Sequence, residues 1–348
     1  APAAVNETAI RLLREQGDTI HCYTSAPGDT GARQRIADSL NRRFGEHYTA
    51  DELYLTVGAA ASLCCVFNGL TCPGDEYILF APYFPEYKVF IEGARGKVQV
   101  IAPEIEQFQI DFTAFEKAVN CRTKGVVINS PNNPSGVVYS RQTLETLAAI
   151  LRAKEALYGH PIYLISDEPY REIAFDGVEV PWVPSIYQDT IVCYSFSKSL
   201  SLPGERLGYV LVPKQTTDAV SVSAAVAGAG RSLGYVNAPS LFQQVTAECC
   251  DLTSDISVYE RNCTLLTDAL REMGYHVVQP GGAFYLFPRS LEPDDMAFSE
   301  RAKQFDLLLV PGSGFGAAGH FRIAYCVQTE MIQRALPRFK ALVDSYKK

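Results

Sequence analysis

The chain has 348 residues, of which 47% are hydrophobic and 20% are charged, and its formal net charge at pH 7 is −8. This length supports a large core and two domains, and the composition is ordinary for a globular enzyme. The negative charge and the lack of a basic stripe argue against a nucleic-acid partner, and no apolar run reaches the roughly 18 residues of a membrane span.

The ten cysteines do not form a disulfide or metal pattern. Cys64–Cys65 and Cys249–Cys250 are adjacent pairs inside apolar helical patterns, and no CxxC or Cys/His cluster with zinc spacing occurs. We therefore expect buried free thiols, no metal and a reducing, cytoplasmic location. No signal peptide is recognised at the start of the chain.

Taken in chain order, the hydrophobic periodicity begins with two amphipathic helices, at 5–16 and 31–44, joined by a turn-rich link. Strands are then predicted at 53–57, 76–80, 97–102, 124–130, 161–166, 190–195 and 207–212. Helices are predicted between them at 58–70, from about Pro85, at 111–119 and at 141–157. This alternation predicts a doubly wound α/β domain with a mainly parallel sheet, whose ligand lies at the C-terminal ends of the strands.

The last third of the chain has a different pattern. A long helix at 254–273 is followed by four strand-like segments and two further helices, at about 294–304 and 329–346. The strand-like segments are YHVV (275–278), AFYLF (283–287), LLLV (307–310) and FRIAYC (321–326). We expect a smaller α+β domain here, with the chain divided into 1–255 and 256–348.

Residues 314–319, GFGAAG, match the GxGxxG pattern of dinucleotide-binding proteins. That motif needs a helix to begin at the glycines, so that its N-terminus faces a pyrophosphate. Here Pro311 interrupts the preceding strand and the next segment, HFRIAYC, is strand-like. The pattern therefore does not predict a dinucleotide site.

The stretch 195–212, SFSKSLSLPGERLGYVLV, holds one lysine, Lys198, among serines and eight residues before Arg206. A desolvated lysine near the end of a strand can attack an aldehyde, while hydroxyls and a forked guanidinium can bind a phosphate. Pyridoxal 5′-phosphate (PLP) carries both groups. A solvated lysine and arginine on a serine-rich loop is the alternative, and the rest of the chain decides between them.

Four motifs follow one another along the chain: SPNNPSG with Asn133, SDEPY with Asp167 and Tyr170, SFSK with Lys198, and FRIAYC with Arg322. Each is weak alone, but the ordered set is specific. From about residue 20 to its C-terminus the chain resembles the fold-type I PLP-dependent enzymes, and among them the class I/II aminotransferases related to aspartate aminotransferase.

The resemblance implies roles around the pyridine ring. Lys198 corresponds to the lysine that holds PLP as an aldimine and then moves the substrate proton, and Asp167 to the carboxylate that keeps the ring nitrogen protonated. Tyr170 and Asn133 correspond to the donors to the phenolic oxygen, and Tyr83 to an aromatic over the ring. The alternatives are an aspartate cap, an Asn-Pro turn and a core tyrosine.

The resemblance also implies a phosphate site. Ser195 and Arg206 match the serine and the arginine that flank the lysine in the family. Gly58, Ala59 and Ala60 open a predicted helix, and they would offer backbone N–H groups to the anion because they lack side-chain donors.

Three further residues are assigned to the substrate and to a second subunit. Arg322 corresponds to the arginine that clamps the substrate α-carboxylate, the alternative being a strand arginine with a surface partner. Tyr23, five residues before Gly28, corresponds to a tyrosine that reaches the neighbour's phosphate, the alternative being a surface tyrosine. Arg231 lies about one residue from where relatives that prefer acidic substrates place a second arginine. The resemblance thus implies a homodimer with shared active sites.

The leading expectation is an aminotransferase that moves an amino group between an L-amino acid and a 2-oxo acid in a ping-pong reaction through the Lys198 aldimine. The same scaffold supports PLP-dependent C–S β-lyases. An alternative of another class is a non-catalytic PLP-binding regulatory domain, but such regulators carry a basic DNA-binding domain, which is not recognised here.

Overall fold

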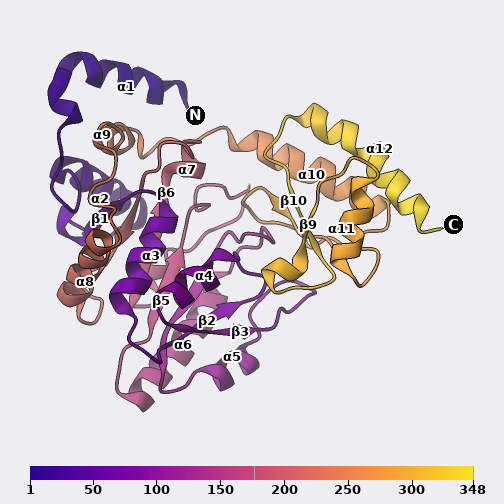
Figure 1. Cartoon of the computed structure of the whole chain (residues 1–348), viewed down its shortest axis with the longest axis horizontal. Coiled ribbons are helices and arrows are strands. Elements are labelled where there is room, and N and C mark those ends of the chain that lie inside the picture. The colour runs from indigo at the N-terminus through magenta and orange to yellow at the C-terminus, as the bar shows by residue number, and fades with distance from the viewer. Residues whose placement is uncertain (176, 348) are drawn as a thin grey trace.

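The computed structural model describes residues 1–175 and 177–347, which form a larger lobe around a seven-stranded sheet and a smaller lobe around a three-stranded one (Figure 1). The strands of the large sheet are β1 (Leu53–Thr56), β2 (Glu76–Phe80), β3 (Lys97–Ile101), β4 (Thr123–Asn129), β5 (Tyr163–Asp167), β6 (Thr190–Ser195) and β7 (Gly208–Leu211). Their order is β1-β7-β6-β5-β4-β2-β3, and β7 alone runs antiparallel to its neighbours. The expected α/β fold with a mainly parallel sheet is confirmed.

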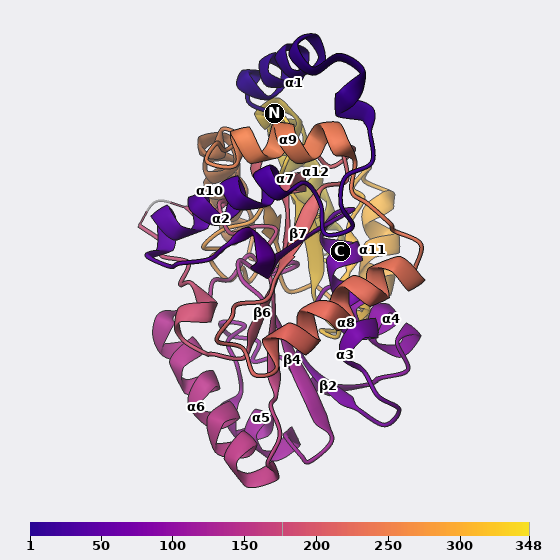
Figure 2. The same cartoon turned by 90° about the vertical axis from the view of Figure 1, so that its left-hand side faces the viewer.

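Helices cover both faces of this sheet and bury its alternate residues. The helices of the large lobe are α1 (Ala3–Gln16), α2 (Thr30–Phe44), α3 (Ala59–Leu70), α4 (Glu86–Gly93), α5 (Phe112–Ala118), α6 (Arg141–Tyr158), α7 (Phe196–Ser199), α8 (Ala219–Ser232) and α9 (Ser240–Cys249). Figure 2 shows α5 and α6 on one face and α3, α4 and α8 on the other. Successive strand residues therefore enter different cores: Ile78 packs with the α5 and α6 side, and Tyr77 and Leu79 with the α3 side.

The smaller lobe contains α10 (Ile256–Glu272), α11 (Asp295–Lys303) and α12 (Thr329–Ser345) around the sheet β8-β10-β9. Its strands are short: β8 (Tyr285–Leu286), β9 (Val310–Pro311) and β10 (Phe321–Ala324). Its core also takes in Tyr170, Ile173 and Phe175, which follow β5 of the large sheet. We propose a domain boundary between residues 255 and 256, because α10 begins the part of the chain that builds this second core.

Some predicted elements differ from the observed ones. Residues 275–278 form no strand, although Tyr275 and Val277 are buried in the second core. Apolar burial alone therefore produced a strand-like pattern there. Residues 314–319 overlap the end of the 3₁₀ turn Gly312–Phe315 and lead into β10. No helix begins at these glycines, which agrees with the prediction.

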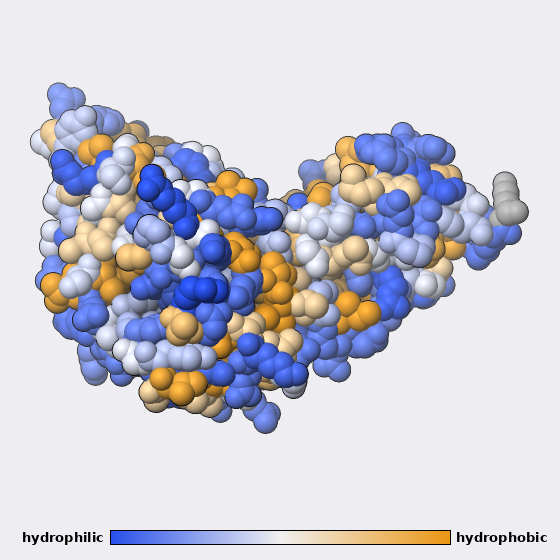
Figure 3. Space-filling model, turned by 60° about the horizontal axis from the view of Figure 1, so that its bottom comes forward, coloured by the Kyte–Doolittle hydropathy of each residue, from blue (hydrophilic) through white to orange (hydrophobic). Residues whose placement is uncertain are grey.

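Within residues 1–175 and 177–347, no helix combines the length and the apolar character that crossing a membrane requires. The two lobes meet at a hollow in the surface, and apolar side chains gather beside it on the larger lobe (Figure 3).

Candidate active site

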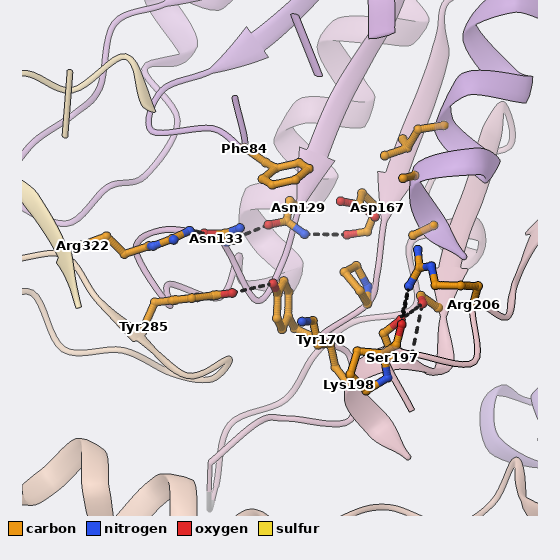
Figure 4. A pocket seen from close by; sticks show the side chains of 16 residues that line it. Phe84, Asn129, Asn133, Asp167, Tyr170, Ser197, Lys198, Arg206, Tyr285 and Arg322 are labelled. Carbon is orange, nitrogen blue, oxygen red and sulfur yellow. Dashed lines mark hydrogen bonds between the residues drawn. The ribbon is translucent and has the colours of Figure 1, made fainter. Parts of the chain in front are cut away.

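A cavity of about 370 Å³ opens at the C-terminal ends of the parallel strands, where the smaller lobe meets the sheet. Its walls are Ala59, Ala60, Leu63, Phe84, Asn129, Asn133, Asp167, Pro169, Tyr170, Ser195, Ser197, Lys198, Pro203, Arg206, Tyr285 and Arg322. Because β4, β5 and β6 are neighbours in the sheet, the residues that end them, Asn129, Asp167 and Ser195, meet at one edge. Figure 4 shows Asn129 and Asp167 side by side there. The volume suits a ligand of cofactor size.

Lys198 lies in α7, the short helix that continues β6. The side chain is partly buried, and Nζ lies 5.3 Å from the centroid of the Phe284 ring. Burial, together with the positive charges of Arg206 and Arg322, lowers the pKa of this amine, and Cys326 acts in the opposite direction. A larger fraction of the amine is therefore neutral, which is the form that attacks a carbonyl.

Asp167 ends β5 and is buried at the cavity wall. Its Oδ2 accepts a hydrogen bond of 2.5 Å from Tyr87, whereas its Oδ1 has no hydrogen-bond partner among the described residues. Burial raises the pKa of the carboxyl to about 7, Tyr87 opposes this rise, and Glu168 adds to it. A buried carboxylate oxygen without a partner indicates that a donor is supplied from the cavity.

One end of the cavity carries donors for an anion. Arg206 donates through Nη1 to Ser197 Oγ at 3.3 Å, and Ser197 Oγ lies 2.7 Å from Ser195 Oγ. The guanidinium lies against Gly58, the N-cap of α3, where a Cβ would come within 2.5 Å of Arg206 Nη2. Gly58 has φ of 86°, so this turn favours glycine for two reasons.

The start of α3 completes this end. Ala59 and Ala60 line the cavity at the first turn of the helix. Helix N-termini present unpaired N–H groups and the positive end of the helix dipole. Two serine hydroxyls, an arginine and this helix start form a donor set for a phosphate.

At the other end, Arg322 reaches into the cavity from β10 of the smaller lobe. Its Nη1 donates to Asn133 Oδ1 at 3.0 Å, and its guanidinium lies 4.8 Å from the Tyr285 ring centroid and 5.0 Å from that of Phe315. Its buried Nε has no partner among the described residues. The two rings fix the position of the guanidinium, and its Nε–H is free to donate to a ligand. Arg322 can therefore bind a carboxylate.

The asparagines and tyrosines between these ends form a hydrogen-bonded frame. Asn129 donates to the backbone oxygen of Asp167 at 2.8 Å and accepts from the backbone N–H of Asn133 at 2.7 Å. The hydroxyls of Tyr170 and Tyr285 lie 3.0 Å apart, and burial raises the pKa of Tyr170 well above its usual value. These contacts fix the side chains that face the cavity centre.

The structure brings together most of the residues predicted from the sequence. Those that line the cavity are Ala59, Ala60, Asn133, Asp167, Tyr170, Ser195, Lys198, Arg206 and Arg322. Tyr23 does not: it is 90% exposed on the connection between α1 and α2. Arg231 is also exposed, in the last turn of α8, and lies outside the cavity lining.

The prediction for Tyr83 needs correction, because Phe84 lines the cavity in its place. The ring of Tyr83 lies beside Gly316, and its backbone N–H donates to Phe315. Both aromatics sit in the irregular PYFP turn after β2, where no strand or helix periodicity determines which of two adjacent rings points inward.

Four polar or aromatic residues of the cavity wall are not among the site residues predicted from the sequence: Phe84, Asn129, Ser197 and Tyr285. The sequence pattern places Asn129 inside the buried strand 124–130, and the usable signal for it is a polar residue at the end of a strand. Ser197 alternates with Ser195 in the SFSK motif, and the sequence offered no reason to separate their roles.

The observed groups fit PLP. The unpartnered Oδ1 of Asp167 suits a protonated ring nitrogen, Lys198 suits the aldehyde, and the Arg206 end suits the phosphate. The fold and the cavity therefore define an enzyme built to hold a cofactor with these three groups.

Comparison with known proteins agrees with the geometry. The family model described as aminotransferase class I and II matches residues 1–339. Aspartate/prephenate aminotransferase of Thermus thermophilus is 32% identical over 97% of this chain and 86% of its own, and aspartate aminotransferase of Thermotoga maritima is 30% identical over 99% and 88%. A solved amino transferase from Eubacterium rectale has a TM-score of 0.98 and 50% identity, covering 100% of this chain and 88% of its own.

The chain belongs to the class I and II aminotransferases. It is a PLP-dependent transaminase, and the relatives favour transamination over the β-lyase and regulatory alternatives.

Proposed function

We propose that this cavity transfers an amino group between an L-amino acid and a 2-oxo acid, with Lys198 as the base that moves the substrate proton. The observation that carries the proposal is that Lys198, the unpartnered Oδ1 of Asp167 and Arg322 with its unpartnered Nε all belong to one cavity. PLP, when bound, supplies an electron sink for the electron pair left at the substrate Cα.

The other side chains would bind and orient. Arg206, Ser195, Ser197 and the start of α3 hold the phosphate, and Asp167 holds the protonated ring nitrogen. Tyr170 and the amide nitrogen of Asn133 donate to the phenolic oxygen, while Asn133 Oδ1 stays engaged by Arg322. Phe84, which lines the cavity, would supply the aromatic ring over one face of the cofactor that the sequence assigns to Tyr83.

Arg322 would bind the substrate α-carboxylate through Nε and Nη2 while Nη1 remains bound to Asn133. A fixed carboxylate and a fixed ring together place the Cα proton near Lys198, which is the positioning that proton transfer needs.

The test of this function is the visible spectrum of the purified protein with added L-glutamate or L-aspartate. We expect the band of the aldehyde form of the cofactor to convert to that of the amine form, and a 2-oxo acid to restore it. Release of pyruvate from L-cystathionine without this conversion would instead identify a lyase.

We also infer a homodimer with shared sites, in which Tyr23 reaches the phosphate of the neighbouring subunit. Two observations support this inference. The side chain of Tyr23 is 90% exposed, although it is aromatic. It also lines a surface pocket of the larger lobe, together with Thr19, Cys22, Asp29 and Ser240. Mixing Tyr23→Ala with Lys198→Ala, each nearly inactive alone, should regenerate activity because one hybrid site is intact. If analytical sedimentation showed that the fully active enzyme is a monomer, the homodimer with shared sites would be excluded.

For the substrate side chain we propose a dicarboxylic amino acid, following the named activity of the aspartate aminotransferases among the relatives. The cavity lining offers Arg322 but no further cation apart from Lys198 and Arg206 among the described residues, so the second carboxylate needs a charge from elsewhere. The exposed Arg231, acting across the dimer, is our candidate.

Replacing Arg231 with alanine should lower kcat/KM for aspartate or glutamate at least about thirtyfold, since removing one partner of a buried ion pair costs about 2–5 kcal/mol. The activity toward an apolar amino acid should stay unchanged. Equal losses for both substrates would show that Arg231 has a structural role.

We place the enzyme in the cytoplasm. The support is chemical: the ten cysteines are free thiols in the described part of the chain, as a reducing compartment allows.

A further inference from the structure

The two oxygens of the Asp167 carboxylate have different environments. Oδ1 is the buried atom without a partner, and Oδ2 accepts the phenolic hydrogen of Tyr87 at 2.5 Å. A carboxylate bound on one oxygen only cannot rotate freely, so the bond to Tyr87 decides which oxygen is presented to the cavity.

Tyr87 is well placed to keep this bond. It lies in the first turn of α4, is fully buried, and belongs to the core between the sheet and α3. Its ring meets Phe84 edge to face, with centroids 5.5 Å apart at 79°. One short segment therefore supplies both the aromatic wall of the cavity and the hydrogen-bond donor to Asp167.

The surroundings of Asp167 have opposite effects on the pKa of its carboxyl. Burial raises its pKa to about 7, and the negative charge of Glu168 adds to the rise. Burial raises the pKa values of the nearby Tyr170 and Cys193, and the negative charge of Asp167 adds to both shifts. The hydrogen bond from Tyr87 is the contact that lowers the Asp167 pKa.

Glu168 has its own cation. Arg171 Nε donates to Glu168 Oε2 at 2.5 Å, and both side chains are buried. That guanidinium is therefore engaged away from Asp167. Tyr87 is the neutral donor that stabilises the Asp167 anion directly.

We infer that Tyr87 is a positioning residue, which holds the Asp167 carboxylate ionised and turned so that Oδ1 meets the protonated ring nitrogen of the cofactor. The inference rests on the proposed contact between Asp167 and that nitrogen. Without Tyr87 the carboxylate becomes a stronger base, and the proton shared with the ring moves from nitrogen to oxygen, with no change in the total number of protons.

The test compares Tyr87→Phe with wild type in two measurements. In the protein freed of cofactor, the carbon-13 resonance of the Asp167 carboxyl should titrate about one to two pH units higher, as expected for losing a hydrogen bond to a charged group. In the loaded protein, PLP labelled with nitrogen-15 in its ring should shift toward the position of an unprotonated pyridine.

Tyr77→Phe is the matched control. Tyr77 is equally buried in the same core, and its hydroxyl lies 2.9 Å from Thr71 Oγ1 rather than beside Asp167. It should leave both resonances at their wild-type values. If Tyr87→Phe does not fold, 3-fluorotyrosine at position 87 keeps the shape and donates more strongly, and it should lower the Asp167 titration midpoint.

An Asp167 midpoint in Tyr87→Phe equal to that of wild type, or an effect of the same size in Tyr77→Phe, overturns the inference. Asp167→Asn separates the two proposals. If it leaves the ring-nitrogen resonance unmoved, the contact between Asp167 and the cofactor fails, whereas a shift in Asp167→Asn without one in Tyr87→Phe refutes only the role of Tyr87.

Discussion

The two ends of the cavity are assembled in different ways. At the Arg206 end, Ser195, Ser197, Lys198 and Arg206 come from one short stretch of chain, closed by the turn at Gly58. At the Arg322 end, Asn133 and Arg322, joined by a hydrogen bond, are 189 residues apart and belong to different lobes.

This difference separates two tasks. At the Arg206 end, the contacts of Arg206 with Ser197 and Gly58 are made within the larger lobe. The Arg322 end depends on a contact between the lobes, because Arg322 of the smaller lobe donates a hydrogen bond to Asn133 of the larger one. We therefore expect changes at the first end to affect the cofactor and changes at the second to affect the substrate.

The largest effect is expected where both tasks meet, at Lys198. Lys198→Ala should reduce turnover by a factor of about 10⁴ or more, because the base and the covalent anchor are lost together. Equilibrium dialysis should still find PLP bound through the Arg206 end. Lys303→Ala, which removes an exposed lysine of α11, is the control and should be fully active.

Arg322→Lys tests the end built across the lobes. It keeps the charge but loses the paired donors, so kcat/KM for the amino acid should fall roughly 30- to 1000-fold. The dissociation constant of PLP should not change. Arg289→Lys, an exposed arginine of the same lobe, should resemble wild type; a weakened PLP affinity in Arg322→Lys would contradict the separation of the two ends.

Arg206→Ala tests the local end. Removing a charged hydrogen bond to a phosphate should weaken PLP binding about ten- to a hundredfold. Pyridoxal, which lacks the phosphate, should bind both proteins with the same affinity. Equal losses for PLP and pyridoxal in a calorimetric titration would show that Arg206 supports the fold instead.

The smallest effect is a change in pH dependence. The lowered pKa of Lys198 means that PLP capture by the cofactor-free protein should increase with pH and level off below the usual lysine value of 10.5. Arg322→Gln removes one of the like charges that lower this pKa, so the midpoint should move to higher pH. Stopped-flow absorbance measures it, and an unmoved midpoint would show that the two charges do not interact.

Much of the site could be read from the sequence because its key residues directly end or follow strands. Asp167 and Lys198 come at the ends of two apolar runs, so local patterns were sufficient to place both at the ligand-binding edge of the sheet, and the resemblance to the class I/II aminotransferases supplied their roles. Local patterns were also sufficient at 314–319, where Pro311 and the strand-like segment that follows argue against a helix, and the structure has a 3₁₀ turn followed by β10.

Tertiary structure decided what periodicity does not encode. Whether Tyr83 or Phe84 faces the cavity depends on how an irregular turn packs against Phe315 and Gly316, which lie more than two hundred residues away. That Tyr87 reaches Asp167 depends on where α4 lies against the sheet. The sequence by itself determined the chemical groups and the strand ends that carry them, whereas the pairing of those groups arose from packing between distant segments, because only packing sets distances across the chain.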